Sequence, residues 1–470
     1  MLRLDLSGKS ILTALLCLLV VWAPLPFASI TPLGRAAIEI AAFVLIIIAI
    51  FSIGRIKDLR PIAPAVLSAA AIGVLALATS LHWPVWLVRL VSPAHVALAE
   101  EAAVAGGWEV PSWVVPSLAP EISRHTGVTW LAVVALVLAA AIAGRRRRRR
   151  RWLVAALLGS AFIQGLLGLR ARLSGIATIW GQAETADASR LRGTFVNQNH
   201  AAFFFMVAAA MAFGLTWWAW RRASREASPE LRVVLRTLPA ALWLALLVAL
   251  TLTGSRAGFT AALVAMVVQI SIVAHRKRQW WLLPAGIGAT LATSGLAAMM
   301  SGYSGLERVV GTSVAGVTQG YRLEAWRACL ELWRRFPFLG TGSGSFREAF
   351  PMVQPQMLIR ESWYHAHNDL LELLVTGGLL TSAVLVMGLA AVGVRLARAF
   401  RHAHRTEDEA FVVAAIGIAV GAMVHEFFDF GLTTPANWVV VSVVLGAALG
   451  IWIRPDSHRR GEPGRASASG

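Results

Sequence analysis

Residues 131–163 read LAVVALVLAAAIAGRRRRRRRWLVAALLGSAFI, in which seven consecutive arginines separate two apolar runs. A helix needs about twenty apolar residues to cross the hydrocarbon core of a bilayer, and both runs continue beyond the quoted stretch. Arginine is costly to bury in that core, so the seven arginines must stay at a membrane surface. The stretch therefore predicts two transmembrane helices joined by a basic loop.

The composition of the whole chain agrees with this prediction. Of its 470 residues, 57% are hydrophobic and only 14% are charged, whereas a soluble domain carries roughly 25% charged residues. Cys17 and Cys329 lie far apart and predict no disulfide framework. We expect an all-α polytopic membrane protein with about twelve transmembrane helices, at residues 10–29, 35–53, 62–82, 127–144, 152–169, 199–219, 238–254, 257–274, 281–300, 369–394, 410–427 and 437–453.

Threading these helices alternately across the membrane predicts their orientation. If the N-terminus is cytoplasmic, the cytoplasmic segments hold 28 of the 43 Lys and Arg residues, as the positive-inside rule requires. We therefore expect a multi-pass protein of the bacterial inner membrane with both termini in the cytoplasm. The seven arginines then anchor the topology against anionic lipid headgroups, so the net charge of +18 indicates membrane lipids, and not nucleic acid, as a partner. The first apolar run has no cleavage site and is read as a transmembrane helix.

The same threading leaves the extended segments 83–126, 170–198 and 301–368 on the periplasmic face. Within the last, YRLEAWRACLELWRRF (321–336) has the periodicity of an amphipathic helix lying on the membrane or against the spans. The GTGSG that follows (340–344) indicates a turn or a close backbone approach, because no strand precedes it as in a nucleotide-binding loop. The predicted apolar stripe of the helix consists of Leu323, Trp326, Cys329, Leu330 and Trp333.

Polar residues gather in five clusters near the periplasmic ends of the spans. A single arginine there can snorkel to water or cap a helix. Several arginines at one boundary favour binding of an anion such as a lipid diphosphate, because guanidinium groups bind phosphate bidentately. The clusters are 189–205 with Arg192, Asn197 and His200, 253–259 with Arg256, the helix 321–336 with Arg322, the segment 364–374, and HEFFDFGLTTPAN at 425–437.

The segment YHAHNDLLELL (364–374) has three interpretations. His365 and His367 with the nearby acids suggest zinc, but no further ligand motif completes such a site. Asp369, followed three residues later by Glu372, resembles a capping box at the start of a helix. His367 is then left over, and a neutral imidazole near arginines is suited to accept a proton from an attacking hydroxyl. We expect neither a metal nor a cofactor.

The residues resemble the superfamily of O-antigen ligases and O-antigen polymerases, which includes bacterial protein O-oligosaccharyltransferases. The pattern that carries the resemblance is a histidine, a small polar residue, nine residues and then Gly-x-x-(Gly, Thr or Tyr). Here it reads His367-Asn368, nine residues, and Gly378-Leu-Leu-Thr381. The stretches GTFVNQNHAA (193–202) and SRAG (255–258) are also similar to this family. The resemblance covers residues 190–382.

This resemblance implies a GT-C-like membrane glycosyltransferase that works without metal and inverts the anomeric centre. It would transfer a glycan from undecaprenyl diphosphate to a hydroxyl of lipid A core, another glycan or a protein on the periplasmic face. By the motif, His367 is the catalytic base or orients the acceptor, and Arg256 and Arg322 hold the diphosphate. We add as substrate-binding residues Arg192, Asn197, His200, Asn368 and His365, the last being a second histidine that departs from the family pattern.

The predicted organisation follows from these assignments. Residues 1–189 form N-terminal helices, 190–382 the catalytic region, 383–453 C-terminal helices and 454–470 a disordered cytoplasmic tail. A twelve-helix transporter is the rival from another class, but SIGRIKDLRP (52–61) does not match the loop of major facilitators. An inactive scaffold would not need His367 with both arginines. Ligases, polymerases, protein-glycosylating enzymes and exopolysaccharide enzymes share these motifs, so the acceptor stays open.

Overall fold

The computed structural model describes residues 8–52, 56–184, 188–300, 312–358 and 363–452, and the predicted tail 454–470 lies outside them. Within this part, nine helices are long and apolar enough to cross a membrane, counting α3 from Asp58. They are α2 (Pro32–Ser52), α3 (Ala63–Thr79), α6 (Pro120–Ala143), α7 (Arg147–Leu173), α8 (Gln198–Ala223), α9 (Pro229–Leu252), α10 (Arg256–Lys277), α15 (Asp369–Arg401) and α16 (Thr406–Phe428).

Three shorter apolar helices lie in the remaining predicted spans: α1 (Gly8–Trp22), α11 (Leu282–Met300) and α17 (Pro435–Leu449). Each of the twelve predicted ranges thus overlaps a helix, which confirms an all-α polytopic membrane protein, while twelve as the number of spans stays a prediction. The other elements are α4 (Val85–Val91), α5 (Pro93–Gly106), α13 (Thr312–Arg335), α14 (Phe346–Ala349), the 3-10 helices Phe27–Ser29, Ile56–Ile62, Phe350–Met352, Gln356–Leu358, Gly431–Thr433 and Gly450–Trp452, and two small hairpins, β1 (Trp83–Pro84) with β2 (Trp113–Val114) and β3 (Thr178–Ile179) with β4 (Ala183–Glu184).

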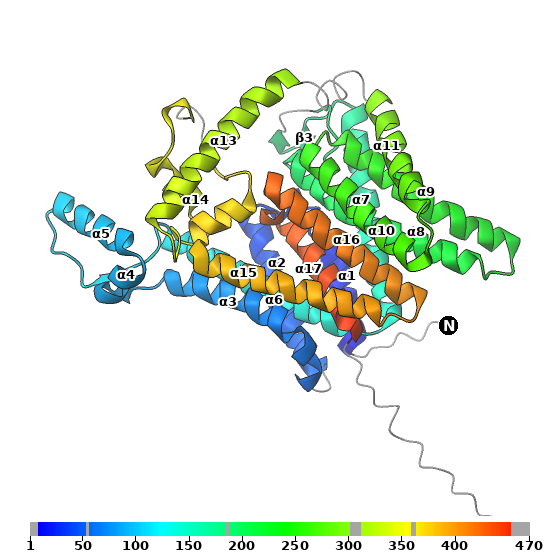
Figure 1. Cartoon of the computed structure of the whole chain (residues 1–470), viewed down its shortest axis with the longest axis horizontal. Helices are drawn as coiled ribbons and strands as arrows, with labels where there is room; N and C mark the ends of the chain where they lie inside the picture. The colour runs from blue at the N-terminus through cyan, green and yellow to red at the C-terminus, as the bar shows by residue number, and fades with distance from the viewer. Residues whose placement is uncertain (1–7, 53–55, 185–187, 301–311, 359–362, 453–470) are drawn as a thin grey trace, which may run out of the picture.

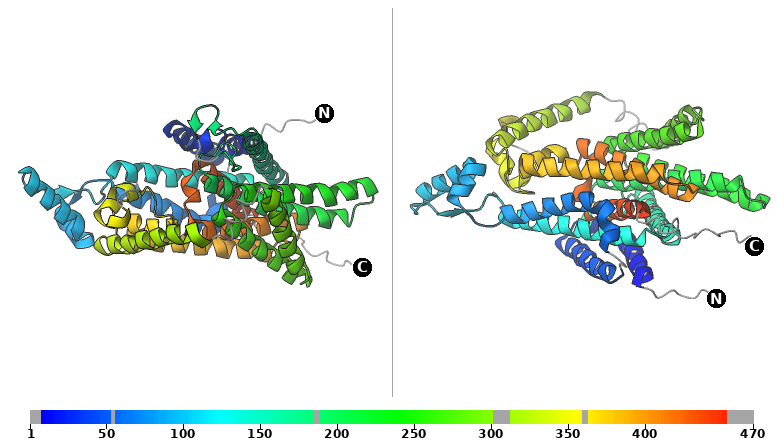
Figure 2. Two further views of the ribbon diagram at one scale, coloured as in Figure 1. Left: turned by 90° about the horizontal axis from the view of Figure 1, so that it is seen from above. Right: turned by 60° about the horizontal axis from the view of Figure 1, so that its bottom comes forward.

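The long helices run side by side, with α8, α16 and α17 in the interior and α3, α6 and α15 along one side (Figures 1 and 2). Small residues allow the close crossings. A Cβ added at Gly144 would lie 2.6 Å from the Cα of Ala447, and one at Gly214 would lie 2.8 Å from the carbonyl oxygen of Ala410. Such contacts are typical of membrane helix bundles. The hydrophobic effect does not drive helices together in lipid, so close van der Waals packing between helix backbones stabilises the bundle instead.

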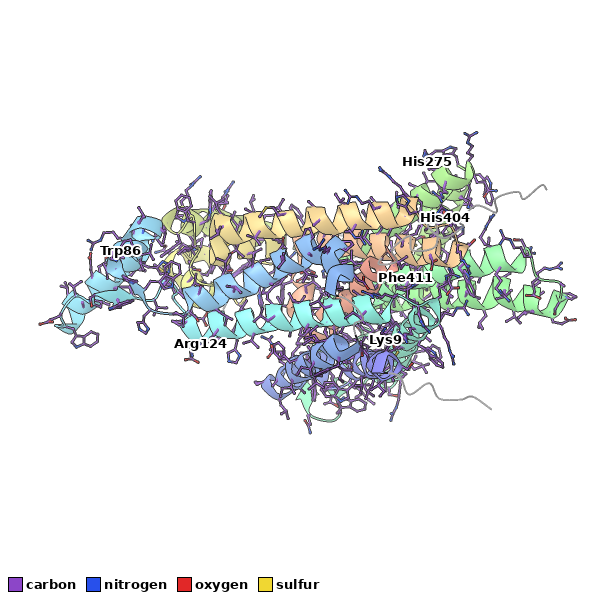
Figure 3. All side chains as sticks on the ribbon, turned by 90° about the horizontal axis from the view of Figure 1, so that it is seen from below. Lys9, Trp86, Arg124, His275, His404 and Phe411 are labelled. Atoms are coloured by element: carbon purple, nitrogen blue, oxygen red, sulfur yellow. The ribbon has the colours of Figure 1, made fainter. Side chains whose placement is uncertain are left out.

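The bundle has two distinct ends. Trp86 and Arg124 lie at one end and His275 and His404 at the other (Figure 3). The first, here called the α13 end, also carries α4, α5, α13 and α14 (Figure 1). Elements of the segments 83–126 and 301–368, which were predicted to share a face of the membrane, therefore lie at the same end of the bundle. Which end faces the periplasm stays a prediction.

At the opposite end, four of the seven consecutive arginines form ion pairs with acidic side chains. Arg145 pairs with Asp58 at 3.1 Å, and Arg147 and Arg150 both pair with Asp408. In the same way Arg151 pairs with Glu407, at 2.6 Å. The acidic first turn of α16 thus lies against the start of α7 and pairs with part of the run. The role of the run as a topology anchor against lipid headgroups stays a prediction.

The helix α13 is present, but its buried stripe is shifted from the predicted one. Leu323 and Leu330 are exposed. The side chains buried on α13 and just beyond it are Ala325, Ala328, Cys329, Leu332 and Phe336. Large apolar residues in this setting can face lipid while small ones pack on protein, so hydrophobicity alone does not give the packed face.

The GTGSG turn makes the predicted close backbone approach. The backbone N–H groups of Thr341 and Gly342 donate to the carbonyls of Val375 and Thr376 in α15, each at 3.0 Å. At that point α15 is interrupted by Gly378, which has φ +66° and ψ −173°. The turn thus inserts into a break in the helix, and this explains one glycine of the family pattern.

Candidate active site

The loop before α15 is held from two sides. Trp326 of α13 donates its indole N–H to the carbonyl of Ala366 at 2.9 Å. Glu372, in the first turn of α15, accepts the backbone N–H of Ala366 at 2.8 Å, and its other oxygen lies 3.1 Å from Nδ1 of His365. These bonds fix the backbone immediately before His367.

The N-cap of α15 is Asn368 and not Asp369, so the predicted capping box is wrong. The Oδ1 atom of Asn368 accepts the backbone N–H of Leu371 at 3.0 Å. Asn368 has the extended backbone usual for an N-cap, whereas Asp369 is already the first helical residue. A cap role for Asn368 is therefore established, and its predicted contact with substrate stays a prediction.

Phe430 lies among three imidazoles. Its ring stacks on His365, with centroids 4.2 Å apart and planes inclined by 21°. The rings of His367 and His200 meet it at steep angles, both with centroids 5.0 Å away. The fold thus brings together three histidines that the sequence places in two distant clusters.

The side chain of His367 lies between the buried carboxylate of Asp429 and solvent. Its Nδ1 lies 3.5 Å from Oδ1 of Asp429, and the two side chains are 32% and 1% exposed. Nδ1 is buried and faces the carboxylate. A neutral imidazole that carries its proton on Nδ1 would keep Nε2 free to accept a proton, as a general base requires. The backbone of His367 has φ +51°, a left-handed conformation that costs a residue other than glycine about 1–3 kcal/mol and is concentrated at functional sites.

Neighbouring charges shift the pKa of two groups outside the spans. Burial would lower the pKa of His365, but its hydrogen bond with Glu372 and the charges of Glu372, Asp369 and Asp429 raise the pKa overall. Burial would raise the pKa of Asp429, but the interactions with His367 and the other imidazoles lower it overall. An ionised Asp429 facing an imidazole is therefore favoured at neutral pH.

His200 and Asn197 lie at the start of α8. Nδ1 of the buried His200 lies 2.6 Å from the hydroxyl of Thr434, and its carbonyl accepts from the side-chain amide of Asn437 at 3.1 Å. Asn197 caps the helix, because its Oδ1 accepts the backbone N–H of Asn199 at 2.8 Å. His200 therefore joins α8 to the turn before α17, and Asn197 fixes the start of α8. The predicted part of both residues in substrate binding stays a prediction.

The arginines approach the same end of the bundle from three elements. Arg322, one helical turn before Trp326 on α13, donates to the carbonyl of Phe428 at 3.3 Å, which places it beside the turn that carries Asp429. Arg256 begins α10, and its exposed side chain makes no hydrogen bond or ion pair with any other residue in the described ranges. Arg192, by contrast, is buried.

Family comparison tests the resemblance directly. A family model described as O-Antigen ligase matches residues 240–386. This region of the chain is similar to the O-antigen ligase family. The resemblance drawn from the sequence is confirmed, and with it a ligase- or glycosyltransferase-type membrane enzyme. The matched residues include Arg256, Arg322, His365, His367 and Asn368, and leave out Arg192, Asn197 and His200. A search of curated proteins finds no match.

Residues that lie beyond the match also contact His367. Asp429 and Phe430 contact His367, and Glu426 lies one helical turn before Phe430. Sequence reasoning recognised 425–437 as a polar cluster but gave none of these residues a role. The signal was the presence of acids beside aromatic residues at a span end, and only the fold shows which histidine they face.

Two further features bear on what the domain can bind. In the part of the chain that the structure describes, no group of three or more His, Cys, Asp or Glu side chains is arranged to hold a metal ion. A pocket lies away from the histidines, between the end of α7 and the β3–β4 hairpin, where Arg170, Trp180, Gly193 and Thr194 contribute to its lining. No histidine is among its lining residues, so this pocket does not include the three imidazoles around Phe430.

Proposed function

We propose that the protein is a metal-independent, inverting glycosyltransferase of surface polysaccharide biosynthesis. It transfers a glycan from undecaprenyl diphosphate to an acceptor hydroxyl at the α13 end, which faces the periplasm. The observation that carries the proposal is His367, backed by the buried carboxylate of Asp429 and open on its Nε2 side. The O-antigen ligase match includes this histidine together with Arg256 and Arg322.

In the proposed reaction the acceptor hydroxyl gives its proton to Nε2 of His367. The hydroxyl oxygen bonds to the anomeric carbon of the donor, and the bond from that carbon to the diphosphate oxygen breaks with its electron pair on the diphosphate. Attack opposite the leaving group inverts the anomeric centre. Asp429 stabilises the imidazolium that forms, as a carboxylate behind a catalytic imidazole does.

The leaving diphosphate needs positive charge in a partly dry site. Arg322 lies beside the Asp429 turn, and Arg256 is exposed at the start of α10. We propose that both arginines bind the diphosphate. Preorganised positive charge stabilises the negative charge that develops on the leaving group, and this is usually the largest single contribution to catalysis. His200, His365, Asn368, Asn197 and Arg192 are proposed to line the same substrate region in a GT-C-like bundle.

A polymerase of repeat units and a protein O-oligosaccharyltransferase remain alternatives with the same chemistry and a different acceptor. A transporter is less consistent with the site, because its polar groups converge on one histidine at a bundle end and not along a central path. The glycosyltransferase alternatives differ only in the acceptor that receives the glycan, so a cellular assay separates them.

The test is complementation of strains that lack either the ligase or the polymerase, with the surface glycan resolved on a gel. Wild type, His367→Ala and Arg256→Ala are compared with His404→Ala and Arg148→Ala, matched exposed residues from the other end of the bundle. We expect rescue of one strain by wild type and both control variants, and loss with His367→Ala and Arg256→Ala. Rescue of neither strain by wild type would overturn the assignment, and full activity of His367→Ala would overturn the base role.

A further inference from the structure

The pocket between α7 and the β3–β4 hairpin has a size and a lining that suit one end of a lipid. Its volume is about 260 Å³, which is below the roughly 300–1,000 Å³ of pockets that enclose a whole small molecule. Leu167, Ile176 and Ile179 give it apolar walls, and the exposed residues Arg170 and Trp180 also line it. The pocket therefore fits a part of a larger molecule that has both an apolar and an anionic portion.

Hydrogen bonds hold the wall of the pocket next to α8. The backbone N–H of Thr194 donates to Oε1 of Gln164 in α7 at 2.8 Å, and its hydroxyl donates to the carbonyl of Pro24 at 2.5 Å. Gly193 has φ +60°, and a Cβ at this position would clash with Oε1 of Gln164. The loop before α8 is thus fixed against α7, and the pocket is a preformed feature of the fold.

Trp180 occupies a turn position that suits a smaller residue. The turn is closed by a bond from the backbone N–H of Gln182 to the carbonyl of Ile179 at 3.0 Å. Its central residues, Trp180 and Gly181, have φ +54° and +75°, a pattern for which Asn-Gly is preferred. The indole N–H donates to the carbonyl of Leu25 at 2.8 Å, which holds the ring beside the pocket. Residues in such unfavourable conformations are concentrated where proteins hold ligands.

Arg170 supplies the positive charge of the pocket. It lies in the last turn of α7, and its exposed side chain forms no hydrogen bond or ion pair with another residue in the part of the chain that the structure describes. A guanidinium group with no acidic partner can bind a phosphate group bidentately. An arginine at a helix C-terminus also interacts favourably with the helix dipole, and this alternative predicts an effect on stability but none on a ligand.

The surface of α7 beside the pocket is apolar. Leu166 and Leu173 are 51% and 77% exposed, and their spacing of four and three residues from Arg170 places them on the same side of the helix as that arginine. On a membrane-spanning helix such side chains contact lipid tails, and the end of the helix lies near the lipid headgroups. A lipid that lies along α7 would therefore bring its phosphate group to Arg170.

We propose that this pocket binds one anionic phospholipid of the surrounding bilayer. The phosphate group contacts Arg170, and the first part of an acyl chain lies against Leu167, Ile176 and the ring of Trp180. We assign a phospholipid because the apolar surface that continues from the pocket faces the bulk lipid, and because no histidine of the candidate active site lines the pocket. The binding is independent of the proposed function.

Photocrosslinking of the full-length protein in phosphatidylcholine vesicles tests the occupant. A phosphatidylglycerol with a diazirine near the start of its acyl chain is irradiated, and the labelled peptides are located by mass spectrometry. We expect label within residues 167–181, and we expect excess unlabelled phosphatidylglycerol to displace it while an equal excess of diacylglycerol does not. Equal displacement by diacylglycerol, which has no phosphate group, would overturn the proposal, and so would the absence of label from these residues.

Two further competitors on the wild-type protein distinguish other sources of phosphate. Undecaprenyl phosphate and inorganic phosphate are each added at the concentration used for phosphatidylglycerol. Displacement by undecaprenyl phosphate but not by phosphatidylglycerol would assign the pocket to an isoprenoid lipid and overturn the proposal. Displacement by inorganic phosphate as effective as that by phosphatidylglycerol would show that the acyl chain contributes nothing, and would also overturn it.

Arg170→Gln and Trp180→Asn test the two proposed contacts. We expect Arg170→Gln to lower the labelling roughly tenfold, because it removes hydrogen bonds between charged groups. Trp180→Asn should also lower the labelling but keep a melting temperature close to that of wild type, because asparagine suits the turn. Arg148→Gln, at the exposed start of the same helix, is the matched control and should label like wild type. Wild-type labelling of both pocket variants, with or without a lower melting temperature, would overturn the proposal.

Discussion

Nδ1 of His367 lies 3.5 Å from Oδ1 of Asp429, although 61 positions separate the two residues along the chain. One belongs to the loop before α15 and the other to the turn after α16. The contact gives His367 a buried carboxylate on one side and leaves Nε2 open on the other. It depends on the packing of α13, α15 and α16 around the loop, so changes to that packing are expected to affect chemistry as well as stability.

Asp429→Asn removes the charge behind His367 while keeping the size of the side chain. We expect glycan transfer to fall roughly a hundredfold or more, because an amide no longer favours Nδ1–H or stabilises the imidazolium. The measurement is the transfer rate in membranes matched for protein amount. Glu407→Gln, at the other end of the bundle, is the control and should retain wild-type transfer. A loss of less than about threefold in Asp429→Asn would count against the base role of His367.

Phe430→Leu tests whether the aromatic ring organises the three imidazoles. Leucine keeps an apolar side chain but cannot stack on His365 or present a face to His367. We expect transfer to fall roughly tenfold or more, since loosely held catalytic groups lose rate. Phe428→Leu, an exposed neighbour, is the matched control. Equal activity of the two variants would show that the ring has no organising role.

The stability of the protein should depend on pH through His365. Its pKa is raised above the ordinary 6.5 in the folded state, so its contribution is fully present below that value and is lost as the pH rises through the raised pKa. Melting temperatures of the detergent-solubilised protein should therefore decline above that value. His365→Gln and Glu372→Gln should both reduce this decline. An unchanged slope in both would contradict the interaction.

Gly378→Ala tests the break in α15. The added Cβ would lie 2.2 Å from the carbonyl oxygen of Phe338, and φ is +66°, so we expect destabilisation by about 3 kcal/mol or failure to fold. Gly393→Ala on the same helix meets nothing within 4 Å and should be neutral or stabilising by up to about 1 kcal/mol. Thermal unfolding and membrane yield report both. Similar behaviour of the two variants would refute the steric argument.

Asp408→Ala removes the acid that Arg147 and Arg150 share. The Arg150 side chain is 4% exposed, so its charge would be left buried without this partner, and we expect a loss of about 3 kcal/mol or more. Arg148→Ala, an exposed member of the same run, should change stability by less than about 0.5 kcal/mol. Equal small effects would show that the ion pairs of Asp408 contribute little to stability.

The sequence predicted the spans well because apolar length and charge at the loops are local properties of the chain. It failed on the packed face of α13, where Leu330 is exposed and Ala328 is buried, because a hydrophobic residue next to a membrane has two apolar environments available. It also failed on the cap of α15, because Asn368 and Asp369 are both good caps and only the backbone conformation distinguishes them.

The sequence by itself determined the helical membrane fold, the family, and His367 as the histidine at the motif spacing. These follow from hydropathy, positive charge and residue spacing, which need no knowledge of long-range contacts. Only the tertiary structure decided which acids face the histidines: Asp429 faces His367, and Glu372 faces His365. The reason is physical, because pairing of buried polar groups depends on how α15 and α16 cross and on the bond between Trp326 and Ala366, and neither is encoded in local sequence.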